Sequence, residues 1–228
     1  MNTLLPYQGL LYKEWIKLRY LGLLPFALLL LALGESFYSM NNLHAASGGQ
    51  SLWTQVLFRS RMYFERMQYL PLFTGIWLAG VQFLPECLNK RLRLFFHLPV
   101  HEQKALALML GTGFALLLGF SALFCVVQAH IVSRFLPTEV AQLTVQTILP
   151  LCLSGFVAYL ATVLVLIEQR PWRRCWHAML GYVLATALCN LNGYGRYVDN
   201  LPVFALLALA LLLGLPGVLD RIRRGLTW

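Results

Sequence analysis

The sequence predicts an all-α integral membrane protein in which an N-terminal interfacial elbow helix precedes six transmembrane helices. Of the 228 residues, 59% are hydrophobic and only 12% are charged, whereas a soluble domain is nearer a quarter charged and about half apolar. In addition, six segments are apolar over about the 20 residues that a spanning helix needs. Residues 1–228 are therefore expected to form a single transmembrane domain, with no large soluble domain and no cleaved signal peptide.

The first expected element is the elbow helix, at residues 8–20. Its apolar residues recur at helical spacing, and its charged residues fall on the opposite face. The apolar face is Leu11, Trp15 and Leu18, and the charged face is Lys13, Glu14 and Lys17. A Trp and basic residues at such a boundary are typical of a helix that lies along the membrane plane.

Six spans follow the elbow helix, joined by more polar connections. They are expected at residues 21–40, 62–84, 105–132, 147–167, 175–191 and 201–219. Residues 41–61 are expected to form a loop with a short helix in it, residues 133–146 a polar connection, and residues 192–200 a short loop rich in turns.

The basic residues predict the orientation of the chain. With six spans both termini lie on one side, and that side carries thirteen of the 18 Lys and Arg residues. The basic excess marks the cytoplasmic face, so both termini are expected in the cytoplasm and the chain in the inner (plasma) membrane of the cell. The net charge of +9 then reflects topology and attraction to membrane lipids or an acidic partner. No nucleic acid is needed to explain it.

A basic and amphipathic segment, residues 86–101, lies between the second and third spans. Its basic residues are Lys90, Arg91 and Arg93, and its bulky apolar residues include Phe95, Phe96 and Leu98. Pro99 ends a helix at or before Leu98, because proline disfavours helical geometry in the residue before it. A short helix at the membrane surface is expected here, either lying among lipid headgroups or docked into a partner.

These features together resemble the permease subunits of type-2 ABC transporters. The shared features are the elbow sequence Tyr12–Arg19 before the spans, the acidic Glu86 before the basic segment, and Leu98-Pro99-Val100 leading into the third span. The resemblance implies that residues 86–101 are the coupling helix that contacts an ATPase subunit. The coupling residues would be Lys90, Arg91, Arg93, Phe95, Phe96 and Leu98, and the elbow residues Lys13, Trp15 and Lys17.

The resemblance also implies the function and the partners. The chain would form the translocation pathway of an exporter together with a second permease copy or a sister permease, and with two copies of an ABC ATPase subunit. It has no Gly-x4-Gly-Lys-Ser/Thr phosphate loop, so ATP and Mg would bind in the partner and the chain would not be an enzyme by itself. The alternative is a stand-alone membrane-embedded enzyme or a lipid-binding scaffold without an ATPase partner.

Other candidate sites are less specific. Glu35 lies inside the first span, where charge is costly and often functional, so Glu35, Tyr38 and Trp77 are candidate pathway residues. The alternatives for Glu35 are an ion pair with Arg59, Arg61 or Arg66 near the outer surface, or a position at the interface because the span ends early. His97 and His101 have a spacing that could present two imidazoles to a metal, but Pro99 interrupts that helix and no metal site is expected. The five cysteines are scattered singly and suggest no disulfide.

Overall fold

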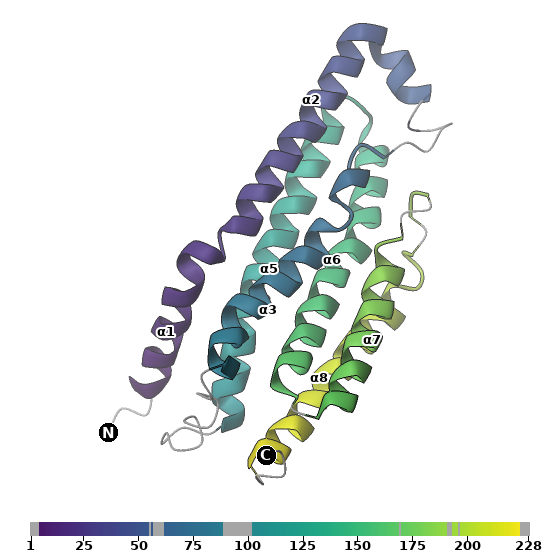
Figure 1. The fold of residues 1–228 in the computed structure, drawn as a ribbon. Coiled ribbons are helices and arrows are strands. Elements are labelled where there is room, and N and C mark those ends of the chain that lie inside the picture. The colour runs from purple at the N-terminus through teal and green to yellow at the C-terminus, as the bar shows by residue number, and fades with distance from the viewer. Residues whose placement is uncertain are drawn as a thin grey trace.

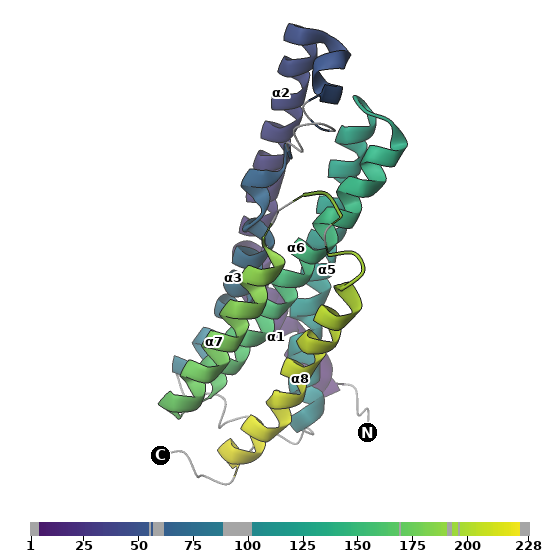
Figure 2. The same ribbon diagram turned by 90° about the vertical axis from the view of Figure 1, so that its right-hand side faces the viewer.

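The structure is a computed structural model that describes residues 5–54, 56, 62–88, 102–168, 170–190, 193–195 and 197–223. This part of the chain is helical and contains no strand. In order, its elements are α1 (Leu5–Leu21), α2 (Leu24–Trp53), the 3₁₀ helix η2 (Glu65–Met67), α3 (Leu70–Leu88), α5 (Glu102–Ser133), α6 (Thr138–Ile167), α7 (Pro171–Leu188) and α8 (Leu201–Arg223). The helices form an elongated bundle, and α1 begins at the end of the bundle where α8 stops (Figures 1 and 2).

Within the residues that the structure describes, four helical stretches are long and apolar enough to cross a membrane. They are Tyr7–Ala46, Gln103–Ser133, Thr138–Ile167 and Leu201–Val218. Many large apolar side chains on the outside of the bundle are also exposed, as expected for a surface in contact with lipid. The chain is therefore an all-helical membrane protein. The two shorter helices, α3 with 19 residues and α7 with 18, are not among the four stretches.

Two predicted spans begin far from the observed start of their helix, and in both cases a proline lies at the observed start. The second was expected from Met62, but helix α3 starts at Leu70, with Pro71 in its first turn, where a missing N–H costs nothing. The fourth was expected from Thr147, but α6 starts at Thr138, directly after Pro137. The expected polar connection 133–146 is therefore helical from Thr138 onward.

Helix α2 also departs from the prediction, because it continues beyond the expected end of the first span at Met40. The expected loop at 41–61 is helical as far as Trp53, with a break at Gly48, whose φ of 72° is a conformation that favours glycine. Met40 is fully buried, and the His44 ring lies 5.7 Å from the ring of Phe135. Contacts with the end of α5 thus hold this part of α2 against the bundle.

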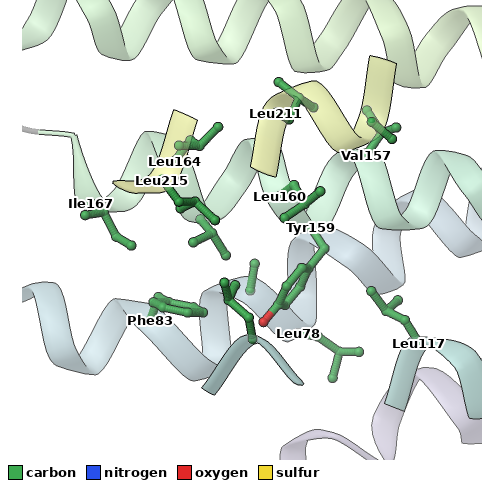
Figure 3. Packing of buried hydrophobic residues seen from close by; sticks show 14 of the residues in the cluster. Leu78, Phe83, Leu117, Val157, Tyr159, Leu160, Leu164, Ile167, Leu211 and Leu215 are labelled. Carbon is green, nitrogen blue, oxygen red and sulfur yellow. The ribbon is translucent and has the colours of Figure 1, made fainter. Parts of the chain in front are cut away.

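The α6 helix is the centre of the fold. It packs against α3, α5, α7 and α8, and 72% of its most apolar stretch is buried, compared with 28% for α5 and 22% for α8. Figure 3 shows the core around it, where Tyr159 points toward α3 among leucines from several helices.

Helix α3 crosses α6 at two glycines. A Cβ atom at Gly75 would lie 2.1 Å from the Gly155 carbonyl oxygen, and one at Gly155 would lie 2.7 Å from the Pro71 carbonyl oxygen. Small residues let two backbones approach in this way. Helix α7 meets α6 in the same manner, since a Cβ at Gly181 would lie 2.2 Å from that of Ala161. These small residues therefore serve packing within one chain.

Candidate functional site: a buried ionic cluster

Four charged side chains meet where α1 packs against the last turn of α3; they are Lys13, Glu14 and Lys17 of α1 and Glu86 of α3. We call this group the ionic cluster. Lys17 Nζ lies 2.5 Å from Glu86 Oε1 and 2.8 Å from Glu14 Oε1, and Lys13 Nζ lies 2.8 Å from Glu86 Oε1. Both glutamates have 0% exposure. A buried charge is tolerated when it is paired, so the two lysines hold these carboxylates in place.

A second polar group continues from the ionic cluster into the bundle. Lys17 Nζ also donates to the Gln82 carbonyl oxygen, at 3.5 Å. The Gln82 side-chain amide donates to the Met109 carbonyl at 2.5 Å and to Thr112 Oγ1 at 3.0 Å, and Tyr159 Oη donates to Gln82 Oε1 at 2.7 Å. We call this the Gln82 network. It connects α3 to α5 and α6, so a continuous set of polar contacts joins four helices.

The two buried carboxylates are not fully satisfied. Oε2 of Glu14 and Oε2 of Glu86 accept no hydrogen bond from the described part of the chain. Burial by itself would raise the pKa of Glu86, but the hydrogen bonds and positive charges of Lys13 and Lys17 lower it below its usual value of 4.5. Glu86 lies beyond the apolar part of the second predicted span, which ends at Leu84. The carboxyl is therefore ionised at neutral pH, although no solvent reaches it.

This lowered pKa predicts a pH dependence of stability. A carboxyl whose pKa is lower in the folded state stabilises the fold above its unfolded pKa, and the contribution decreases as the pH falls through the folded value. We expect the free energy of unfolding of the wild type to approach that of Glu86→Gln as the pH is lowered below about 4.5. Urea unfolding of both proteins in detergent between pH 7 and pH 3 measures the difference. Parallel pH profiles would contradict the assignment.

The cluster stands directly before the predicted coupling segment. Glu86 is two residues from Leu88, where α3 ends. The predicted coupling residues, Lys90, Arg91, Arg93, Phe95, Phe96 and Leu98, lie outside the described residues, as do His97 and His101. Within the described residues, no group of three His, Cys, Asp or Glu side chains could hold a metal ion.

The elbow helix differs from the prediction in two ways. A different face of the helix packs against the bundle, and the helix runs in a different direction. Of its expected apolar face only Leu18 is buried, whereas Trp15 is 64% exposed and the charged Glu14 is buried. The charged face is thus the packed face, because its partner Glu86 lies on α3. Figures 1 and 2 show α1 leading into α2 through a bend rather than lying across the spans. At this bend, Trp77 Nε1 donates to the Leu21 carbonyl at 2.8 Å.

The structure does not bring the three candidate pathway residues together. Glu35 accepts a hydrogen bond from Arg66, and both side chains are exposed, so Glu35 is paired with one of the arginines that the ion-pair alternative names. Glu35 lines a pocket of about 270 Å³ between α2 and the η2 region. Tyr38 is exposed and not part of this pocket, and Trp77 lies at the bend after α1.

Sequence reasoning overlooked Gln82 and the role of Glu14. A signal for Gln82 was present, because a glutamine inside an otherwise apolar helix is costly and needs partners. For Glu14, the spacing to Lys17 gave an i, i+3 pair that equally fits a solvated face. Glu14 is buried because α1 packs against α3, where its partner Lys17 also pairs with Glu86, 69 residues away in the sequence.

The geometry is therefore that of a connection between helices, with charges held away from water and no constellation for covalent chemistry in the residues described. Comparison of the chain with protein-family models, with curated proteins and with solved structures finds no match.

Proposed function

We propose that the chain is the membrane-spanning permease subunit of an ABC transporter, coupled to a separate ATPase subunit and serving export. The single observation that carries the proposal is the position of the ionic cluster. It attaches α1 to the last turn of α3, immediately before the basic amphipathic segment that resembles a coupling helix. A force applied to that segment would therefore pass to α1, α3, α5 and α6 through the hydrogen bonds and ion pairs of the ionic cluster and the Gln82 network.

The arrangement of the helices supports the proposal. Helices α2, α3, α5, α6, α7 and α8 alternate in direction along the bundle (Figures 1 and 2), as six spans would. At about 1.5 Å per residue, α3 and α7 are both nearly as long as the roughly 30 Å hydrocarbon core of a bilayer. The basic excess favours a cytoplasmic location for the α1 end of the bundle. A force from a cytoplasmic ATPase would arrive at this end.

The Gln82 network gives the proposal its mechanism. When the end of α3 moves, Glu86 carries α1 with it through Lys13 and Lys17. Gln82 lies one turn earlier on α3 and transmits the same displacement to α5 through the Met109 carbonyl, and to α6 through Tyr159. Breaking these bonds inside the bundle would leave buried polar groups unpaired, which costs free energy, so the helices are expected to move together.

Co-purification tests the proposal. The chain is expressed with a tagged ATPase subunit encoded beside it, and the amount of bound ATPase is measured after purification in detergent. We expect Phe95→Asp and Arg91→Glu each to reduce the bound ATPase at least tenfold, because aromatic and arginine anchors carry most interface energy. The matched control is Arg134→Glu, an exposed arginine at the opposite end of the bundle, which should have no effect. Equal binding by all three variants would contradict the proposal and favour a stand-alone membrane protein.

A further inference from the structure

An open apolar groove runs between α7 and α8. It has a volume of about 540 Å³, and its lining includes Leu164 of α6, Leu180 and Val183 of α7, and Leu207, Ala210 and Gly214 of α8. Both α7 and α8 pack on α6 but scarcely contact each other, as Figure 2 shows by their positions on either side of it. The groove therefore faces the lipid, with α6 as its floor.

One end of the groove is polar and basic. Trp176 and His177 line it there, and Arg173 lies one turn earlier on the same face of α7. The Arg173 side chain makes no hydrogen bond or ion pair with the described part of the chain. Arg170 and Arg174 lie close to it in sequence.

The acidic residues at this end do not neutralise it. Glu168 is 1% exposed, lies 4.0 Å from His177 Nε2 and accepts a hydrogen bond from the Arg170 amide, so its charge is directed inward. Near the start of α7, the described side chains therefore include Glu168 against three arginines, Arg170, Arg173 and Arg174. The groove thus has an apolar body and a cationic mouth.

The mouth lies at the depth of lipid headgroups. Trp172 and Trp176 form an edge-to-face pair with ring centroids 6.2 Å apart, and both are more than half exposed. Exposed tryptophans gather at membrane–water interfaces. Arg173 lies between them in sequence and is therefore at the level where lipid phosphates are found.

We propose that this groove binds an anionic phospholipid, with one acyl chain between α7 and α8 and the phosphate on Arg173. An amphiphile with an anionic head matches both the apolar body and the cationic mouth, and basic pockets between transmembrane helices on the cytoplasmic side are known to hold such headgroups. A second copy of the chain fits less well. In a two-fold symmetric interface the same patch meets itself, which would place the arginine mouths against each other. This inference goes beyond the permease proposal and does not depend on an ATPase.

The test uses the full chain in nanodiscs that contain equal amounts of dioleoyl phosphatidylglycerol and dioleoyl phosphatidylcholine. These lipids share their acyl chains and differ in headgroup charge. After transfer to detergent, native mass spectrometry counts the lipids that stay bound. We expect retained phosphatidylglycerol to exceed phosphatidylcholine, and Arg173→Gln to reduce its retention about tenfold, the usual effect of losing one charge-assisted hydrogen bond.

Filling the groove provides the second arm. Ala210→Trp should displace the lipid, whereas Leu213→Trp, on an exposed part of α8 outside the groove, should not. Arg134→Gln is the control for Arg173→Gln. Equal retention of the two lipids by the wild type, or unchanged phosphatidylglycerol in both Arg173→Gln and Ala210→Trp, would overturn the proposal. So would a dimer that Ala210→Trp dissociates while the lipid count stays the same.

Discussion

Replacing Gly75 with alanine should destabilise the protein more than any other single added methyl group on α3. The new Cβ would lie 2.1 Å from the Gly155 carbonyl oxygen and 3.0 Å from the Tyr159 backbone nitrogen. Both atoms belong to the α6 backbone and cannot rotate away, so the two helices must separate. Overpacking a tight core costs about 1–3 kcal/mol and occasionally more, and we expect a loss of about 3 kcal/mol here, measured by thermal unfolding in detergent.

Gly80 supplies a matched control on the same helix. A Cβ at Gly80 would meet no atom within 4 Å, so Gly80→Ala adds the same methyl group without a clash. Alanine is a better helix former than glycine by about 1 kcal/mol, and the control should be neutral or slightly more stable. Opposite signs for the two variants would locate the helix crossing at Gly75. A loss of similar size in both would show that α3 and α6 do not approach as closely as described.

Removing the charge of Glu86 should have the second large effect. In Glu86→Gln, Lys13 and Lys17 lose their shared partner, and Lys17, whose side chain is only 16% exposed, keeps Glu14 alone. Breaking a buried ion pair by removing one member costs about 3–5 kcal/mol. Lys13 is 39% exposed and can be solvated in part, so we expect a loss near the lower limit, about 3 kcal/mol, measured by urea unfolding in detergent at pH 7.

Two further variants separate the ionic cluster from a general effect of charge. Glu35→Gln removes a carboxylate that pairs with Arg66 of η2, but that pair is exposed and should contribute about 0–1 kcal/mol. Exchanging the charges in Lys17→Glu/Glu86→Lys should recover part of the stability lost in Glu86→Lys alone. If Glu35→Gln and Glu86→Gln destabilise equally, burial of the cluster is not what makes it important.

The sequence predicted the helical membrane class and the position of most apolar helices. The sequence was less informative about helix ends that lie beyond the lipid. Hydropathy identifies the residues in contact with hydrocarbon, whereas a helix continues for as long as its backbone hydrogen bonds are formed. The α6 helix shows this well, since Val140 and Thr144 are buried before the expected span begins at Thr147. Prolines indicated the helix starts better than hydropathy did, since Pro71 and Pro137 mark the observed starts of α3 and α6.

The ionic cluster could not be predicted from local patterns. The charged face of α1 looks like a solvated face when it is read alone, and Glu86 looks like a span boundary. Only the packing of α1 against α3 and α5 brings the four charges together and removes the two carboxylates from water. The resemblance used both the elbow sequence Tyr12–Arg19 and Glu86, but it gave no reason for their charged side chains to meet.

The unequal lengths of the helices have a consequence for the surrounding membrane. Helices α2, α5 and α6 have 30, 32 and 30 residues, against 18 in α7 and 23 in α8, and at about 1.5 Å per residue the two groups differ by more than 10 Å in height. Because the longer helices extend beyond the lipid, their outer turns should stand above the membrane surface on the flank away from α7 and α8. The membrane surface would thus be covered by protein on one flank and left open beside α7 and α8.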